Sequence, residues 1–210
     1  MDAIELLTTT KAVRRRIDFE RSVPFKLLEE CVAIAVQAPL GGEEWQPHFL
    51  IVDDPSLIET IGALYNEINQ PYIDDIEAKA LDAADSADHD SIRRVHETYR
   101  WHGDQMSRMP ALVIVGVKGR YESQPQIMQA SAYGSILPAA WSFMLAARSK
   151  GLGATWTTLH LANADRVGAV LRLPDDFTQA VMLAVGFYTG DSFKPAKRLP
   201  VSSYVHRNGW

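Results

Sequence analysis

The sequence of 210 residues contains a single cysteine, Cys31, and no apolar segment that approaches the length of a membrane span. One thiol cannot close an intramolecular disulfide, and no group of cysteines and histidines has the spacing of a zinc site. The N-terminal segment also lacks the apolar stretch and small-residue cleavage site of a secretory signal. We therefore expect a cytoplasmic protein in a reducing compartment, with no structural metal and no membrane partner.

Several motifs that bind nucleotides or build hydrolytic sites are missing too. There is no GxGxxG, no GxxxxGK[ST], no GxSxG and no HExxH. The formal net charge of −5 argues against general nucleic-acid binding, because counterion release requires a basic face. The histidines are scattered, and we expect His89, His96 and His102 to be exposed to solvent.

The apolar pattern that is present predicts an α+β fold with a central sheet buried on both faces. Residues 71–108 are rich in Ala, Asp, Glu and Arg and predict exposed helix. Pro138 lies within one helical segment, so that helix is expected to begin or kink there. The predicted helices are 24–37, 55–68, 129–150 and 164–171, and the predicted strands are 49–52, 111–117, 154–158 and 180–187. We expect one domain, residues 1–210, with a variable helical excursion or lid at about 69–108.

Positive charge is concentrated near the two ends of a chain that is acidic overall. Either the two ends meet around one anion, or they are two separate solvated faces. Arginine suits an anion site because its planar fork binds phosphate through two hydrogen bonds. Three consecutive guanidinium groups point in different directions, so at most two can serve one anion. The basic residues are Lys11, Arg14, Arg15 and Arg16 near the start and Lys194, Lys197 and Arg198 near the end.

Two glycine-containing loops allow close approach, and the first leaves backbone N–H groups free to approach a flat ligand. The first, APLGG, contains Pro39, Leu40, Gly41 and Gly42 and follows the predicted helix 24–37. The second, GLGATWTT, spans 151–158 and ends in Thr157 and Thr158. Each loop is a weak signal when it is taken alone.

The basic start, the APLGG loop, GLG after a long helix, and the terminal KRLP…VHRNGW together resemble the nitroreductase family of flavoproteins. The resemblance covers nearly the whole chain and is weakest between about 69 and 108. It implies an α+β fold with a mostly antiparallel sheet flanked by helices. It also implies a homodimer whose C-terminal tail extends onto the partner subunit, where Trp210 would dock.

The resemblance further implies an FMN site. Some of Lys11, Arg14, Arg15 and Arg16, together with Arg198, would hold the FMN phosphate. Pro39, Leu40, Gly41 and Gly42 would lie beside the ribityl chain and ring, and Thr157 and Thr158 near flavin N5 and the pyrimidine edge. Residues 135–141 would come from the partner's side of the site. Arg14 or Arg15 is the side-chain candidate near flavin N1, and no catalytic residue is assigned.

The activity that the resemblance implies is hydride transfer from NADH or NADPH, through FMN, to a small planar acceptor such as a nitroaromatic or quinone. Two alternatives stay open: a flavin-binding protein without turnover, and an enzyme that uses another donor such as a deazaflavin. Glu43, Trp45 and Trp141 stand where relatives often have amides, and an ionised Glu can only accept hydrogen bonds. Tyr99, Trp101 and His102 would either cap the substrate pocket or simply anchor a helix.

Overall fold

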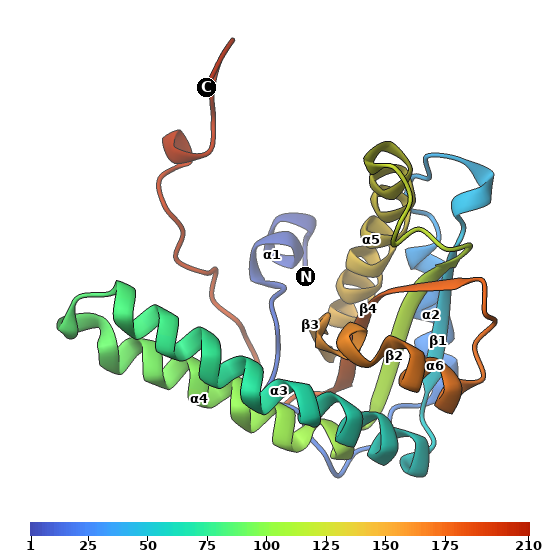
Figure 1. Ribbon diagram of the computed structural model, residues 1–210, viewed down its shortest axis with the longest axis horizontal. Coiled ribbons are helices and arrows are strands. Elements are labelled where there is room, and N and C mark those ends of the chain that lie inside the picture. Colours follow the sequence, from blue (N-terminus) through green and yellow to red (C-terminus); the bar gives the residue numbers. More distant parts are fainter.

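The computed structural model describes all 210 residues and contains six α-helices and one four-stranded sheet (Figure 1). The strand order is β1-β2-β4-β3, and every neighbouring pair is antiparallel. The predicted α+β fold is thus confirmed. The helices are α1 (Ala3–Thr9), α2 (Phe25–Ala35), α3 (Pro55–Ala83), α4 (His89–Gln105), α5 (Gln126–Ser149) and α6 (Ala164–Leu171), and the strands are β1 (Pro47–Val52), β2 (Ala111–Lys118), β3 (Leu152–Thr157) and β4 (Phe177–Phe187).

Both faces of the sheet are covered, which explains the uninterrupted apolar sequence of its central strands. Along β2, Val113 and Val115 pack with α2 and α5 on one face. Leu112 and Ile114 pack with α3 and α6 on the other. Because successive strand residues point to opposite faces, a strand with two covered faces must be apolar at every position.

Two helices continue through a proline at which the sequence suggested a break. Helix α3 was predicted to end at 68 but continues through Pro71 to Ala83, because the buried Ile73 continues its packed face. Helix α5 begins at Gln126, so the alternative of a start near Pro138 was wrong. The fully buried Ile136 and Phe143 lie on either side of that proline, so core packing outweighs the hydrogen bond that it removes.

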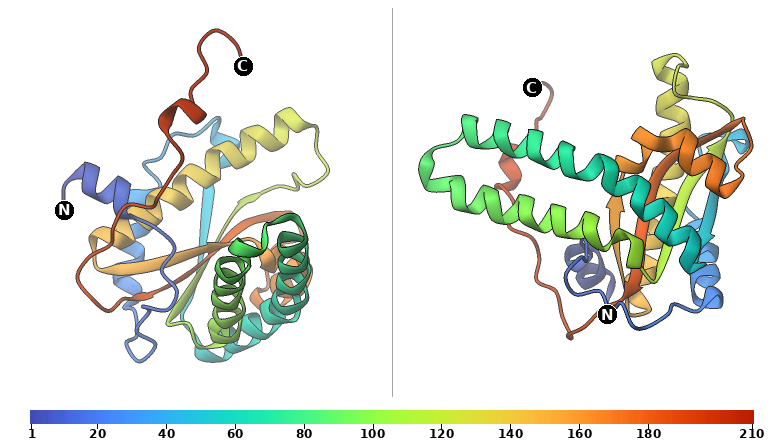
Figure 2. Two further views of the ribbon diagram at one scale, coloured as in Figure 1. Left: turned by 90° about the vertical axis from the view of Figure 1, so that its left-hand side faces the viewer. Right: turned by 60° about the horizontal axis from the view of Figure 1, so that its bottom comes forward.

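Helices α3 and α4 form an antiparallel hairpin that projects beyond the sheet (Figures 1 and 2). The segment 69–108 lies within this hairpin. Arg100 of α4 forms ion pairs with Asp74 and Glu77 of α3, which join the two helices. None of the helices combines the length and apolarity that crossing a lipid bilayer demands.

The N-terminal segment that follows α1 lies along β3 and β4. Ala12 bridges to Ala154, and Val13 N–H donates to the Ala154 carbonyl at 3.0 Å. Gly153 is required here, since a Cβ at that position would lie 2.8 Å from Val13 Cβ. The GLG motif therefore serves close packing of the basic segment against the sheet. At the opposite end the chain leaves the body as an extended tail, and Trp210 is fully exposed (Figure 1).

Candidate functional site

The three consecutive arginines point in three directions. Arg15 lies over the Trp101 ring, 5.2 Å from its centroid, and its guanidinium is 3.9 Å from Glu97 of α4. Arg14 stacks on Tyr99, with 5.1 Å between the guanidinium carbon and the ring centroid. Tyr99 and Trp101 therefore anchor α4 to the basic segment.

Arg16 is occupied by the C-terminal segment. Its Nε donates to the Thr189 carbonyl at 2.6 Å and its Nη1 to the Ser192 carbonyl at 2.8 Å. Arg14, in contrast, makes no hydrogen bond or ion pair, and its Nε is buried without a partner. Burial lowers the pKa of Arg14, as expected for a cation without a nearby carboxylate.

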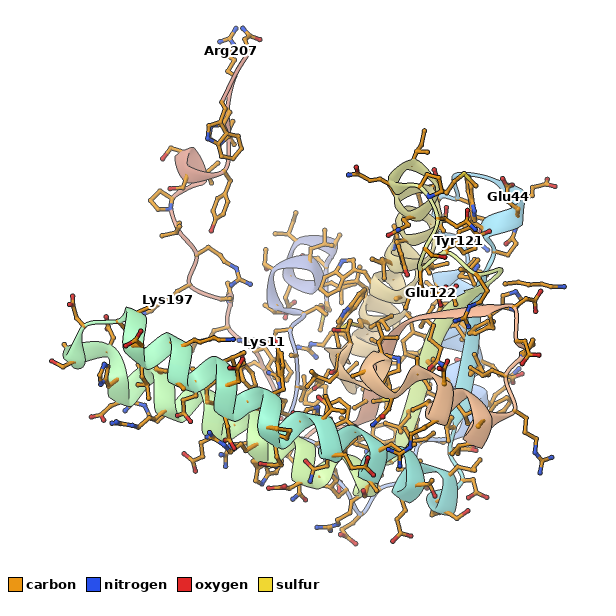
Figure 3. The ribbon with its side chains drawn as sticks, viewed as in Figure 1. Lys11, Glu44, Tyr121, Glu122, Lys197 and Arg207 are labelled. Carbon is orange, nitrogen blue, oxygen red and sulfur yellow. The ribbon has the colours of Figure 1, made fainter.

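A groove of about 490 Å³ runs along the basic segment. The C-terminal residue that brings charge to it is Lys194, whereas Lys197 and Arg198 lie further out on the exposed tail (Figure 3). Neither Lys11 nor Lys194 has an acidic partner. The groove is thus strongly electropositive. Its lining residues are Lys11, Ala12, Val13, Arg14, Arg15, Arg16, Thr98, Ser192, Phe193 and Lys194.

A smaller cavity of about 200 Å³ lies on the other side of Arg14, between the α3–α4 hairpin and the end of β3. Thr157 lines it, and the hydroxyl oxygens of Thr157 and Tyr65 are 3.0 Å apart. Thr158 is exposed and does not line the cavity. The lining residues are Arg14, Tyr65, Asn69, Tyr72, Ile73, Ile76, Tyr99, His102, Thr155, Trp156, Thr157 and Leu159.

His102, one of the residues expected either to cap the substrate pocket or to anchor a helix, lines this cavity. The prediction that His96 and His102 are exposed was wrong: they are 8% and 3% exposed, because this face of α4 packs on α3. His96 Nδ1 lies 2.8 Å from the Ile92 carbonyl, but neither ring nitrogen of His102 has a partner. Burial, together with the charge of Arg14, lowers the pKa of His102 to about 4, so the ring is neutral near pH 7.

The APLGG loop lies apart from the groove and the cavity in the folded chain. Gly41 N–H donates to Ser135 Oγ at 2.9 Å, so the loop packs against α5. Trp45 is buried in that same region, and Glu43 is exposed. None of Pro39, Leu40, Gly41 and Gly42 lines the groove or the cavity. Within one chain the structure therefore brings together the basic segment and Thr157, but not the APLGG loop or Arg198.

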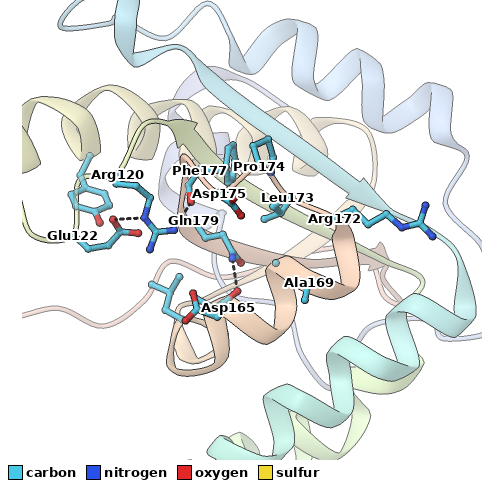
Figure 4. A pocket seen from close by; sticks show the side chains of 14 residues that line it. Arg120, Glu122, Asp165, Ala169, Arg172, Leu173, Pro174, Asp175, Phe177 and Gln179 are labelled. Carbon is cyan, nitrogen blue, oxygen red and sulfur yellow. Dashed lines mark hydrogen bonds and ion pairs between the residues drawn. The ribbon is translucent and has the colours of Figure 1, made fainter.

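The largest cavity, about 520 Å³, lies between α6 and the start of β4 (Figure 4). Gln179 points into it and donates from Nε2 to the Ala164 carbonyl at 2.8 Å. Arg120 pairs with Glu122 at its edge. Acidic side chains balance its arginines, and it shares no residue with the groove or with the predicted site.

The Nitroreductase family model matches residues 10–187. Protein DrgA of Synechocystis sp. is 28% identical over 166 residues, which cover 78% of this chain and 73% of that protein. The family match includes the basic segment, the APLGG loop and Thr157.

Solved structures with the same fold cover nearly the whole chain. A BluB-like flavoprotein from Clostridium difficile 630 has a TM-score of 0.70 at 20% identity, with 99% of each chain covered. Oxidized iodotyrosine deiodinase bound to FMN and 3-iodo-L-tyrosine has a TM-score of 0.71 at 22% identity, with 99% of this chain and 98% of that chain covered. NfrA2 of B. megaterium has a TM-score of 0.72 at 16% identity and covers 100% of this chain, which spans 76% of NfrA2.

Proposed function

The chain belongs to the nitroreductase family of oxidoreductases, and from this premise we propose that it is an FMN-dependent enzyme that uses NADH or NADPH to reduce a small planar acceptor, such as a nitroaromatic or a quinone. One observation carries the proposal. Arg14 forms a wall shared by the electropositive groove and the small aromatic cavity. A phosphate-bearing cofactor held in the groove would therefore have a substrate pocket immediately beside it.

The residues of the groove fit the phosphate of FMN. Arg15 and Arg16 are engaged with α4 and the C-terminal segment, which leaves Lys11, Arg14 and Lys194 as cations without acidic partners. We assign Lys11 and Lys194 to the phosphate, because charge-assisted hydrogen bonds to phosphate are the strong ones. Arg14 is assigned to the pyrimidine edge, where a cation favours the anionic reduced flavin. Bound FMN supplies the hydride-transfer chemistry, and these residues bind and orient it.

The proposal includes a homodimer. The loop at 39–42 does not reach the groove of its own chain, so a second copy would supply that loop and the tail with Arg198. Large apolar side chains on α1, α2 and α5 support a partner surface. Ile4 is 71% exposed, Phe25 51% and Ile127 73%. We also propose a cytoplasmic location, where the reduced nicotinamide donors are available.

No feature of the single chain favours the alternative of a flavin-binding protein without turnover. That alternative needs Trp45 and Trp141 to close the substrate face. Trp45 packs in the core beside α5, Trp141 is 37% exposed on α5, and neither lines the cavity.

The visible spectrum of the purified protein is the first test. We expect flavin absorbance, together with NADH or NADPH oxidation that depends on an added nitroaromatic or quinone. Colourless protein that takes up no FMN on reconstitution would overturn the proposal. Yellow protein that oxidises neither NADH nor NADPH would favour a flavin-binding protein without turnover. Flavin that is reduced only by a deazaflavin would show that the enzyme uses that donor in place of NADH or NADPH.

A variant pair tests the phosphate assignment. Lys11→Ala and Lys194→Ala should each weaken FMN binding about tenfold or more, because each removes a charge-assisted contact. Lys79→Ala is the matched control, since Lys79 pairs with Asp75 on the surface of the hairpin. Equal FMN affinity in all three variants would refute the assignment.

A further inference from the structure

We propose that the cavity beside Arg14 is the acceptor site and that it selects acceptors with a single aromatic ring that carries an anionic oxygen as well as the reducible group, as in a nitrobenzoate. This inference rests on the proposed function for its role in turnover. The site itself is defined by the chain alone: its size, its unpartnered polar atoms and its charge.

The size of the cavity suits a single ring. A cavity of roughly 150 Å³ is large enough to hold benzene, and this one measures about 200 Å³. A ring with one or two small substituents therefore fits inside it. Tyr65, Tyr99 and Trp156 line the walls, and aromatic rings pack well against one another in offset or edge-to-face arrangements.

The polar atoms in the wall lack partners. Arg14 Nε and both ring nitrogens of His102 are buried and make no hydrogen bond. Buried polar groups in native proteins are almost always satisfied, and an unsatisfied group carries its full desolvation cost. The other guanidinium nitrogens of Arg14 remain available to the pyrimidine edge of FMN, because arginine has five N–H donors. Arg14 Nε and the ring of His102 therefore point to a second ligand, beside FMN, whose oxygens accept from both.

The charge of the wall specifies an anion. No carboxylate pairs with Arg14, and the neighbours that favour its charge are the phenol groups of Tyr99 and Tyr65. The neighbouring hairpin cation Arg100 is, by contrast, paired with Asp74 and Glu77. An arginine remains protonated even when it is partly buried, so it favours an anionic group over a neutral one of equal shape. The neutral His102 then adds one N–H donor without adding charge.

Calorimetric titration of the purified, FMN-saturated protein with benzoate and with benzamide tests the proposal without any turnover. The two probes have nearly the same shape, and only benzoate carries a charge. We expect benzoate to bind about tenfold more tightly or better, the difference that one charge-assisted hydrogen bond contributes.

Variants of the histidine locate the binding. His102→Leu should weaken benzoate binding about tenfold, and His102→Gln, which keeps a donor, should restore most of it. His160→Leu is the matched control. His160 is also fully buried with both ring nitrogens unpartnered, but it does not line the cavity. Its benzoate affinity should equal that of the wild type, and melting curves confirm that each variant is folded.

Three results would overturn the inference: no binding of either probe, equal affinity for both, or equal losses in His102→Leu and His160→Leu. Failure of the proposed function looks different. Protein that takes up no FMN is titrated without it, and benzoate binding as expected would then retain the assignment of the cavity as a site for an aromatic anion and overturn the enzyme assignment.

Discussion

Replacing Gly62 by alanine tests how the hairpin is seated on the body of the protein. Gly62 lies on α3 against the turn at 106–108 that leads to β2. A Cβ at Gly62 would lie 2.4 Å from Ser107 N and 2.5 Å from Ser107 Cα. Both are backbone atoms, so no side-chain rotation relieves the clash and the helix must shift.

The expected magnitude follows from two opposing effects. Overpacking a close contact costs about 1–3 kcal/mol, and alanine in place of glycine stabilises a helix interior by about 1 kcal/mol. A clash with backbone atoms at this distance lies in the upper part of the overpacking range, about 2–3 kcal/mol. The net loss is then about 1–2 kcal/mol, which lowers the melting temperature of a chain of this size by roughly 2–8 °C. Because the hairpin forms one wall of the cavity, benzoate affinity should fall as well.

Thermal melts of Gly62→Ala and Gly168→Ala make the comparison. A Cβ at Gly168 of α6 would meet only Gln179 Nε2 at 3.6 Å and Leu173 at 3.9 Å, which are ordinary contacts. Gly168→Ala should therefore keep the helix gain and melt roughly 2–4 °C higher than the wild type. A Gly62→Ala protein that melts at or above the wild-type temperature would refute the close packing of α3 on the 106–108 turn.

Three further perturbations address the tail, a buried histidine and the hairpin. Arg198→Ala should weaken FMN retention, and unchanged affinity would show that the tail does not reach the phosphate. Burial lowers the pKa of His160 from 6.5 to about 4. The neutral ring therefore stabilises the fold above pH 6.5, and this contribution of roughly 3 kcal/mol is lost as the pH falls toward 4. Urea titrations at several pH values should show a shallower pH dependence of stability in His160→Gln than in the wild type. Arg100→Met should cost the hairpin about 1 kcal/mol, because it leaves the largely buried Glu77 unpaired, and hydrogen exchange across the hairpin should become roughly fivefold faster.

The apolar pattern of the sequence predicted the sheet and most helices because burial on both faces leaves a strong signal. The strand at 111–117 is an example: its apolar run is matched by β2, buried on both sides. The pattern failed at Pro71 and Pro138, where packing of distant residues overrides a local preference for termination. A proline changes one hydrogen bond, whereas the neighbouring Ile73 or Phe143 buries an entire side chain.

The candidate site was predictable only in part. Lys11 and Arg14 stood out because charge clustering is visible in the sequence. His102 was considered as a pocket cap, but its burial was not predicted, because the burial of a polar helix depends on which of its faces meets its partner. Tyr65 and Asn69 escaped notice for the same reason, since each lies on α3 far along the chain from the basic segment. The sequence also could not show which of the three arginines is free to bind a ligand. That depends on their contacts with residues 97–101 and 189–192, which are distant in the sequence.

The position of the basic segment also determines when the groove can exist during synthesis. Val13 bonds to Ala154, Ile17 bridges to Tyr188, and Arg16 holds the carbonyls of Thr189 and Ser192. Residues 12–17 thus acquire their folded neighbours only after residues 154–192 have been synthesised. A nascent chain cannot form the groove while β4 is still inside the exit tunnel.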